Sequence, residues 1–227
     1  MATGGERALV GPATRQILTD SVYDAVKALI MDDVVRPGAK LNMDALARDL
    51  AVSQTPIREA LARLESERLV VKEPLRGYTS APLLSATAFA DLYEFRLHLE
   101  PWAAGRAAER IGPAGRAALA AELATCTEEP PAGAGYADYK AFASHDARFH
   151  DLVMRLAGNE TARAALADTH CHLHIFRLFY SSDTGATVHT EHADVVTAIG
   201  AADSASATAA MRAHLEAARD RLRPYVR

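Results

Sequence analysis

The stretch RPGAKLNMDALARDLAVSQTPIREALARLESERLVVKEPLRGY, residues 36–78, decides the fold of the N-terminal part of the chain. Asn42 is a favoured N-cap residue, and the leucines that follow it at helical spacing predict a short helix. Ser53 is the expected N-cap of a further helix that runs to near Glu67, with Pro56 in its first turn, where proline is tolerated. Two helices joined by so short a turn are typical of a helix-turn-helix.

The sequence on either side predicts the winged form of this motif. Apolar residues recur at helical spacing over residues 17–34, until the Pro-Gly pair at 37–38 predicts a turn. Two short strands are expected at residues 69–72 and 78–80, joined by the Pro/Gly loop 73–77. Three helices and a small β-hairpin therefore predict a winged helix-turn-helix over residues 16–81. The residues before it, 1–15, are rich in Gly, Ala and Thr and are expected to form a flexible tail.

The rest of the chain has helical patterns and no strand pattern. Pro82 marks the expected linker, and Pro101 is expected to kink or break the first helix that follows it. A loop is expected at residues 129–135. The expected helices cover residues 85–109, 114–127, 136–157, 160–180, 187–202 and 203–222. We therefore predict a mainly α protein whose residues 83–227 form an all-α antiparallel helical bundle.

Composition sets limits on function. Of the 227 residues, 49% are hydrophobic and 24% charged, as in an ordinary globular protein of two domains. The net charge of -4 argues against a broadly basic nucleic-acid coat, so DNA binding requires a local patch. The two cysteines have no zinc-module or disulfide-framework spacing, and no apolar run has membrane-spanning length. We expect a cytoplasmic protein with no membrane partner.

The start of the second helix of a helix-turn-helix reaches base edges and phosphates in the major groove. A glutamine there pairs with adenine, an arginine suits guanine or phosphate, and hydroxyls donate to phosphates. Each residue alone is more simply explained by N-capping or by solvation, so the prediction depends on the set. The predicted DNA-binding residues are Ser53, Gln54, Thr55 and Arg58 on this helix and Arg76 and Gly77 at the tip of the wing.

Residues 36–78 resemble the signature of the GntR family of regulators over the whole winged domain. The resemblance implies operator binding as a homodimer, with two recognition helices on the two halves of a palindromic site. The chain departs from the family pattern at Gln54, where arginine is frequent, and at Arg68, where glycine is frequent. The first departure leaves the base preference open.

A candidate metal site emerges from the histidines. Asp146 and His150 are four residues apart in one helical pattern, so their side chains share a face. His192 and His214 each lie beside apolar residues of later helices and are candidates to complete the set. One carboxylate and three imidazoles suit Zn, Ni, Mn or Fe. The alternative is that these histidines are ordinary packing residues.

The C-terminal part resembles the FCD ligand-binding domain of the FadR subfamily. The resemblance rests on LYEFRLHLEPWAAGRAA, HDARFHDLVMRLAGN, EHADVVTAI and MRAHLEAA, which begin at residues 92, 145, 191 and 211. It implies that Asp146, His150, His192 and His214 are metal ligands, with Zn the favoured ion. It also implies that Arg96 clamps a small carboxylate effector. A surface ion pair between Arg96 and Glu100 is the alternative for this arginine.

Three other interpretations remain. Cys171 with His170, His172 and His174 resembles a metal cluster, but residues one or two apart on a helix diverge, so surface or pocket-lining roles are favoured. A metal-dependent enzyme is disfavoured because no HExxH, GxSxG or phosphate-loop motif is present. A sensor of the metal itself is the remaining alternative. We predict a DNA-binding regulator, not an enzyme, and expect a repressor that a small organic acid releases.

Overall fold

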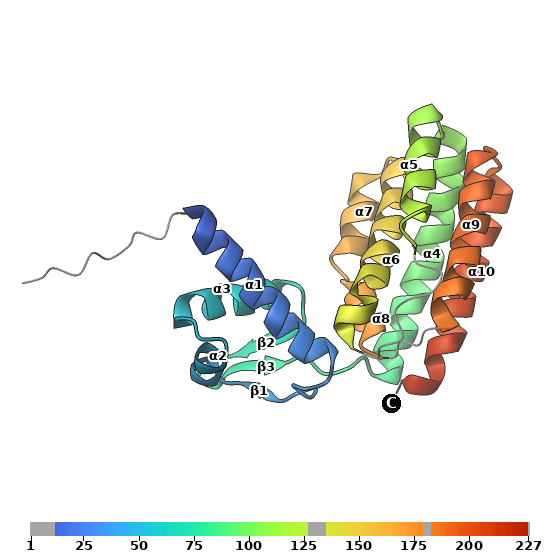
Figure 1. Ribbon diagram of the computed structural model, residues 1–227. Coiled ribbons are helices and arrows are strands. Elements are labelled where there is room, and N and C mark those ends of the chain that lie inside the picture. The colour runs from blue at the N-terminus through green and yellow to red at the C-terminus, as the bar shows by residue number, and fades with distance from the viewer. Residues whose placement is uncertain (1–11, 127–134, 179–182, 227) are drawn as a thin grey trace, which may run out of the picture. The chain divides into compact units, whose positions relative to one another are not determined.

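The computed structural model describes residues 12–126, 135–178 and 183–226 and divides into two compact units, residues 1–82 and 83–227. The first unit is drawn in blue to cyan in Figure 1 and joins three helices to a small sheet. The sheet is antiparallel with the order β1-β3-β2, and Val70 pairs with Ser80. Its elements are α1 (Pro12–Met31), β1 (Lys40–Leu41), α2 (Met43–Asp49), α3 (Gln54–Ser66), β2 (Val70–Glu73) and β3 (Gly77–Ser80). The predicted winged helix-turn-helix is thus confirmed.

Capping and apolar spacing explain why α2 and α3 form where they do. The Asn42 side chain accepts hydrogen bonds from the backbone N–H groups of Asp44 and Ala45, as expected for an N-cap. On α3, Ile57, Leu61 and Leu64 recur at helical spacing and are fully buried. Burying this stripe leaves Gln54, Thr55 and Arg58 exposed at the start of α3.

Side-chain contacts fix α3 against α1. The Tyr23 hydroxyl donates to the Glu67 carboxylate at 2.6 Å, and the Lys27 ammonium lies 3.2 Å from the same carboxylate. The Arg63 guanidinium stacks 3.7 Å from the centroid of the Tyr23 ring. Helix α3 is therefore held by polar contacts as well as by its apolar stripe.

The boundaries of this unit differ from the expected ones in three places. Helix α1 begins at Pro12, so residues 12–15 of the expected tail are helical, while residues 1–11 lie outside the described residues. It ends at Met31 rather than residue 34, and Asp33 then adopts a positive φ of 57°. Strand β1 was not predicted, because two residues are too short for an alternating pattern. Ser53 occupies the N-cap position of α3, but its side chain makes no capping hydrogen bond.

The second unit is helical throughout its described residues, which confirms the predicted fold class. Figure 1 shows α4, α5, α6, α9 and α10 running side by side, and α4 packs most extensively against α10 and α6. Its elements are α4 (Ala86–Arg110), α5 (Pro113–Leu123), α6 (Tyr136–Ala157), α7 (Glu160–Ala167), α8 (Cys171–Phe176), α9 (Asp183–Gly200), α10 (Ser204–Leu222) and the 3-10 turn η1 (Arg223–Tyr225). No described helix is both long and apolar enough to cross a membrane.

Close packing between α4 and α10 sets the geometry of the bundle. A Cβ atom added at Gly105 of α4 would lie 2.5 Å from the Thr208 hydroxyl of α10, so only glycine permits this approach. The core that these helices share includes Phe149 of α6, Val195 of α9 and Met211 of α10. Helices from distant parts of the sequence therefore meet along one buried seam.

Two helical expectations need correction. Of the kink or break expected at Pro101, the break is excluded, because α4 continues from Ala86 to Arg110 with Pro101 buried inside it. The helix expected over 160–180 is instead two helices, α7 and α8, separated at His170, which has a positive φ of 48°. The Thr169 hydroxyl donates to the Leu166 carbonyl and accepts from the Cys171 N–H, and such side-chain bonds compete with helix continuation. Residue 180 and most of the loop expected at 129–135 lie outside the described residues.

Candidate metal centre and DNA-reading surface

The structure brings the four predicted metal ligands together. Asp146 and His150 project from α6, His192 from α9 and His214 from α10. One potential ligand atom of each lies within 4.8 Å of those of the other three. Three helices that are distant in sequence thus contribute to one donor cluster in the bundle core.

The donor atoms are buried and face one another. His150, His192 and His214 are 1%, 0% and 3% exposed. The Nε2 atoms of His150 and His214 are 3.2 Å apart, and the His192 Nε2 lies 3.6 Å from the Asp146 Oδ1. Within the described part of the chain, the His192 Nε2 has no hydrogen-bond partner. A buried nitrogen without a hydrogen-bond partner is normally satisfied by a cation or by a hydrogen-bond donor.

Carboxylates hold the outer nitrogens of two of these imidazoles. The His214 Nδ1 lies 2.7 Å from a Glu191 oxygen, and the His150 Nδ1 contacts the Glu100 Oε2. An ionised carboxylate only accepts hydrogen bonds, so each histidine donates from Nδ1 and keeps a lone pair on Nε2. Two lone pairs that face each other repel, unless a positive ion lies between them.

The third imidazole, that of His192, is linked to a carboxylate through a second histidine. The His192 Nδ1 lies 3.0 Å from the His145 Nε2, and the His145 Nδ1 lies 3.1 Å from the Glu122 Oε1. If Glu122 accepts from His145, then His145 accepts from His192, and the lone pair of His192 is again on Nε2. All three Nε2 lone pairs therefore point into the cluster, which is the pattern that outer hydrogen bonds impose on metal-binding histidines.

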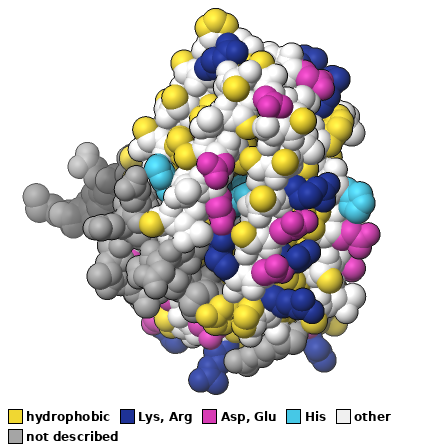
Figure 2. Space-filling model, turned by 90° about the vertical axis from the view of Figure 1, so that its right-hand side faces the viewer, with side chains coloured by type: hydrophobic (Ala, Val, Ile, Leu, Met, Phe, Trp, Pro, Cys, Tyr) yellow, Lys and Arg dark blue, Asp and Glu magenta, His cyan; other side chains and the backbone are white. Residues whose placement is uncertain are grey.

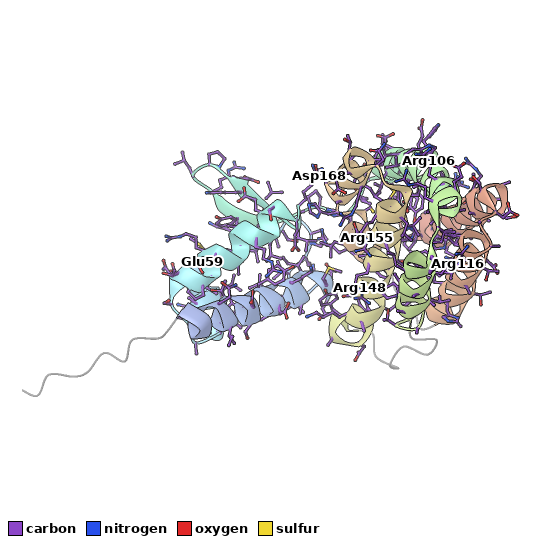
Figure 3. All side chains as sticks on the ribbon, turned by 90° about the horizontal axis from the view of Figure 1, so that it is seen from above. Glu59, Arg106, Arg116, Arg148, Arg155 and Asp168 are labelled. Carbon is purple, nitrogen blue, oxygen red and sulfur yellow. The ribbon has the colours of Figure 1, made fainter. Side chains whose placement is uncertain are left out.

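Each supporting carboxylate is also paired with an arginine. The Arg96 Nε donates to Glu100 at 2.6 Å, and the Arg221 Nη2 donates to Glu191 at 2.9 Å. Arg148, which extends from α6 in Figure 3, lies 3.0 Å from Glu122. These pairs neutralise the outer carboxylates, so a divalent ion held with Asp146 leaves a net positive charge at the centre. On the face drawn in Figure 2, acidic and basic side chains are likewise interspersed.

Protonation of the cluster suits a metal. Burial lowers the pKa of His150 to about 4 and the pKa of His192 well below its ordinary value, so both imidazoles are neutral at pH 7. Burial opposes ionisation of Asp146, but the hydrogen bond from the His172 Nδ1, 2.7 Å from its Oδ2, and the electrostatic attraction of His172, His150 and His192 together outweigh it and hold the pKa of Asp146 well below the usual range. Three imidazoles and one carboxylate, with His150 and His192 neutral, fit Zn, Ni, Mn or Fe.

Several residues of this centre were not predicted. Glu100, Glu191, His145 and Glu122 support the imidazoles, and His172 supports Asp146. The pairing of Arg96 with Glu100 was expected at the surface, and it is instead buried in the core. The only signals in the sequence were the four-residue spacing of Arg96 and Glu100 and the position of Glu191 next to His192.

The predicted DNA-binding residues lie at the start of α3 and on the wing. Ser53, Gln54, Thr55 and Arg58 are all exposed, and the positive end of the helix dipole lies among them. The Gln54 Nε2 donates to the Asp44 Oδ1 of α2, a contact that the sequence did not predict.

The wing carries the remaining predicted DNA contacts. Between β2 and β3, the Arg76 side chain is 82% exposed, and Gly77 has a positive φ of 89°. Arg68 also adopts a positive φ of 57° just before β2, which explains why the resembling family favours glycine there.

Comparison with known proteins agrees with both units. The model of the bacterial regulatory proteins of the gntR family matches residues 18–79, and the FCD domain model matches residues 91–217. An uncharacterised helix-turn-helix-type transcriptional regulator of Agrobacterium vitis is 33% identical over 137 residues, 60% of this chain and 79% of that protein. The gluconate operon transcriptional repressor of Bacillus licheniformis is 29% identical over 126 residues, 56% of this chain and 49% of that protein.

Solved structures share the fold. A GntR regulator from Rhodococcus sp. RHA1 superposes with a TM-score of 0.68 at 23% identity, covering 92% of this chain and 99% of that one. McbR/YncC of E. coli gives a TM-score of 0.67 at 20% identity, covering 91% and 97%. The matched proteins regulate transcription and are not enzymes. The chain therefore belongs to the gntR family of bacterial DNA-binding transcription regulators and carries a C-terminal FCD domain.

Proposed function

We propose that this regulator is a repressor whose operator affinity is controlled by a small organic acid bound at a divalent metal ion in the FCD domain. The observation that carries the proposal is the convergence of three buried Nε2 atoms and the Asp146 carboxylate, with the His192 Nε2 lacking a described hydrogen-bond partner. Asp146, His150, His192 and His214 would hold the ion, and Zn is the ion we favour.

A metal held by four protein ligands supplies a Lewis-acidic position when its coordination shell expands, and carboxylate oxygens bind such positions. The net positive charge left at the centre favours an anionic effector. Arg96 is buried one turn from Glu100 and would clamp the far end of that effector. The gluconate operon repressor among the relatives takes its name from the operon of an organic acid, which agrees with this class of ligand and with repression.

Operator binding would use both halves of a homodimer. In this proposal, two α3 helices enter successive major grooves of a palindromic site and the wings reach the flanking backbone. Ser53 and Thr55 donate to phosphates, Gln54 and Arg58 read bases or phosphates, and the tip at Arg76 and Gly77 follows the adjacent groove. The acid acts by binding one arrangement of the dimer more tightly than the other, because equal affinity would shift nothing.

Operator affinity measured with and without organic acids tests this proposal. For metal-loaded wild type, we expect an effective acid to weaken operator binding about 5- to 150-fold, the usual range of coupling between two sites. His192→Ala is expected to bind the operator but to lose the response, because the ion that anchors the acid is lost. His98→Ala, which removes an exposed histidine outside the cluster, should respond like wild type. The proposal would be contradicted if no acid changed the operator affinity of the metal-loaded protein.

A further inference from the structure

The Tyr93 hydroxyl is a buried polar group with no hydrogen-bond partner in the described structure. Tyr93 lies on α4, is 1% exposed, and packs in a core cluster with Phe89, Met154 and Cys171. A buried O–H without an acceptor costs free energy, so nearly all such groups in proteins are satisfied. The Tyr93 hydroxyl is therefore available to an acceptor from outside the described residues.

Unpaired donors also occur one turn further along α4. The Arg96 guanidinium carbon lies 5.5 Å from the centroid of the Tyr93 ring, and the residue is buried. Among the described residues, its one hydrogen bond runs from Nε to the Glu100 Oε1. The two terminal nitrogens of Arg96 and the hydroxyl of Tyr93, three residues apart on one face of α4, thus make no described hydrogen bond, and we call them the donor group.

Glu100 makes no described hydrogen bond to these donors, although both of its oxygens have other partners. Its Oε1 accepts from Arg96 and its Oε2 contacts the Nδ1 of His150. The same contacts place the donor group next to the metal centre, since one carboxylate joins Arg96 to the metal-ligand candidate His150. Burial raises the pKa of Tyr93, so its O–H remains a donor at neutral pH.

We propose that Tyr93 and Arg96 together bind a second carboxylate of the effector, which makes the ligand a short dicarboxylate rather than a monocarboxylate. This inference rests on the proposed function, in which the first carboxylate binds the metal. A carboxylate offers about four lone-pair sites, enough for a guanidinium fork and a phenol at once. In a monocarboxylate, a methyl group would stand in place of the second carboxylate and would leave these donors without acceptors. A site built to hydrogen-bond a ligand group binds analogues that lack this group much more weakly.

Calorimetric titration of metal-loaded protein tests the proposal with acids matched in carbon number. Succinate, glutarate and adipate are compared with butyrate, pentanoate and hexanoate. We expect wild type to bind its preferred dicarboxylate at least about tenfold more tightly than the matched monocarboxylate. Tyr93→Phe should lose about tenfold in affinity for that dicarboxylate and less than about twofold for the monocarboxylate, with unchanged metal content.

Tyr23→Phe serves as the control, because it removes a phenol of the winged unit that is bonded to Glu67. Its acid affinities should equal those of wild type. Equal binding of the two acid classes by wild type, or an unchanged preference in Tyr93→Phe, would overturn the role of Tyr93 and leave the proposed function standing. If metal-loaded wild type binds none of the six acids, the inference is overturned, whereas the proposed function is decided by the operator-affinity measurement with other organic acids.

Discussion

His150 and His214 face each other through Nε2 atoms only 3.2 Å apart, although each presents its Nδ1 to a carboxylate. When both rings are neutral and both Nδ1 atoms donate, no proton is available for a hydrogen bond between the two Nε2 atoms. The contact is therefore repulsive without a cation and favourable with one. A bound metal ion is therefore expected to stabilise the protein.

Metal removal is expected to destabilise the FCD domain. A ligand present at 1,000 times its Kd stabilises a protein by about 4 kcal/mol. For a chain of this size, that loss lowers Tm by roughly 10 °C. The measurement is thermal unfolding before and after chelation, followed by re-addition of Zn. An unchanged Tm in protein shown by elemental analysis to have lost its metal would contradict the prediction.

His214→Ala is expected to lose the metal in the purified protein. The substitution removes one donor and leaves Glu191 without the N–H that it accepts. We expect metal content to fall from near one ion per chain to a small fraction, as measured by elemental analysis. His98→Ala is the matched control, since it removes an exposed histidine and should retain the ion. Equal metal content in both variants would rule out His214 as a ligand.

Glu191→Gln tests the outer hydrogen bonds. The variant keeps the size of the side chain but removes the negative charge that fixes the His214 tautomer and pairs with Arg221. Changes to such outer groups typically cost about 10- to 100-fold in metal affinity. Competition with a chelator measures this loss. Glu94→Gln on the exposed face of α4 should show the affinity of wild type.

Much of the fold followed from local sequence signals, and much of the centre did not. The spacing of Asp146 and His150 identifies one face of α6 because both lie on one helix. His145, one residue before Asp146, has no such signal, since its role appears only when α9 brings His192 within 3.0 Å. Glu100 lies 50 residues from His150 and contacts it only through the packing of α4 on α6. Such long-range contacts depend on tertiary packing, which spacing along the chain does not encode.

The end of α6 shows how a single backbone position affects the framework of the site. Gly158 has a positive φ of 72°, and a Cβ there would lie 2.8 Å from the Arg110 guanidinium. Gly158→Ala should therefore destabilise the protein by about 1–2 kcal/mol. Gly200→Ala is the control, because nothing lies within 4 Å of its Cβ position and its φ is not positive. Denaturant unfolding should show Gly200→Ala to be neutral or slightly stabilised. Equal destabilisation of both variants would refute the role of the positive φ.

The hydrogen bond between Gln54 and Asp44 restricts which groups of the Gln54 side chain are available to a base. This allows a test of operator recognition that does not depend on the metal centre. The Asp44 carboxylate only accepts, so the Gln54 amide gives it an N–H and retains its oxygen as an acceptor. In the major groove, that oxygen fits the amino groups of adenine and cytosine. We expect Gln54→Ala to lose about 1–3 kcal/mol of base discrimination at one position of each half-site. Asp44→Ala should relax the same position.

Arg58→Ala should weaken operator binding markedly at fixed salt, while Arg106→Ala, which removes an equal charge from the exposed surface of α4, should not. All four variants are measured by competition binding with operators that are substituted one base pair at a time. If Gln54→Ala keeps the base preference of wild type, α3 reads the site through other residues.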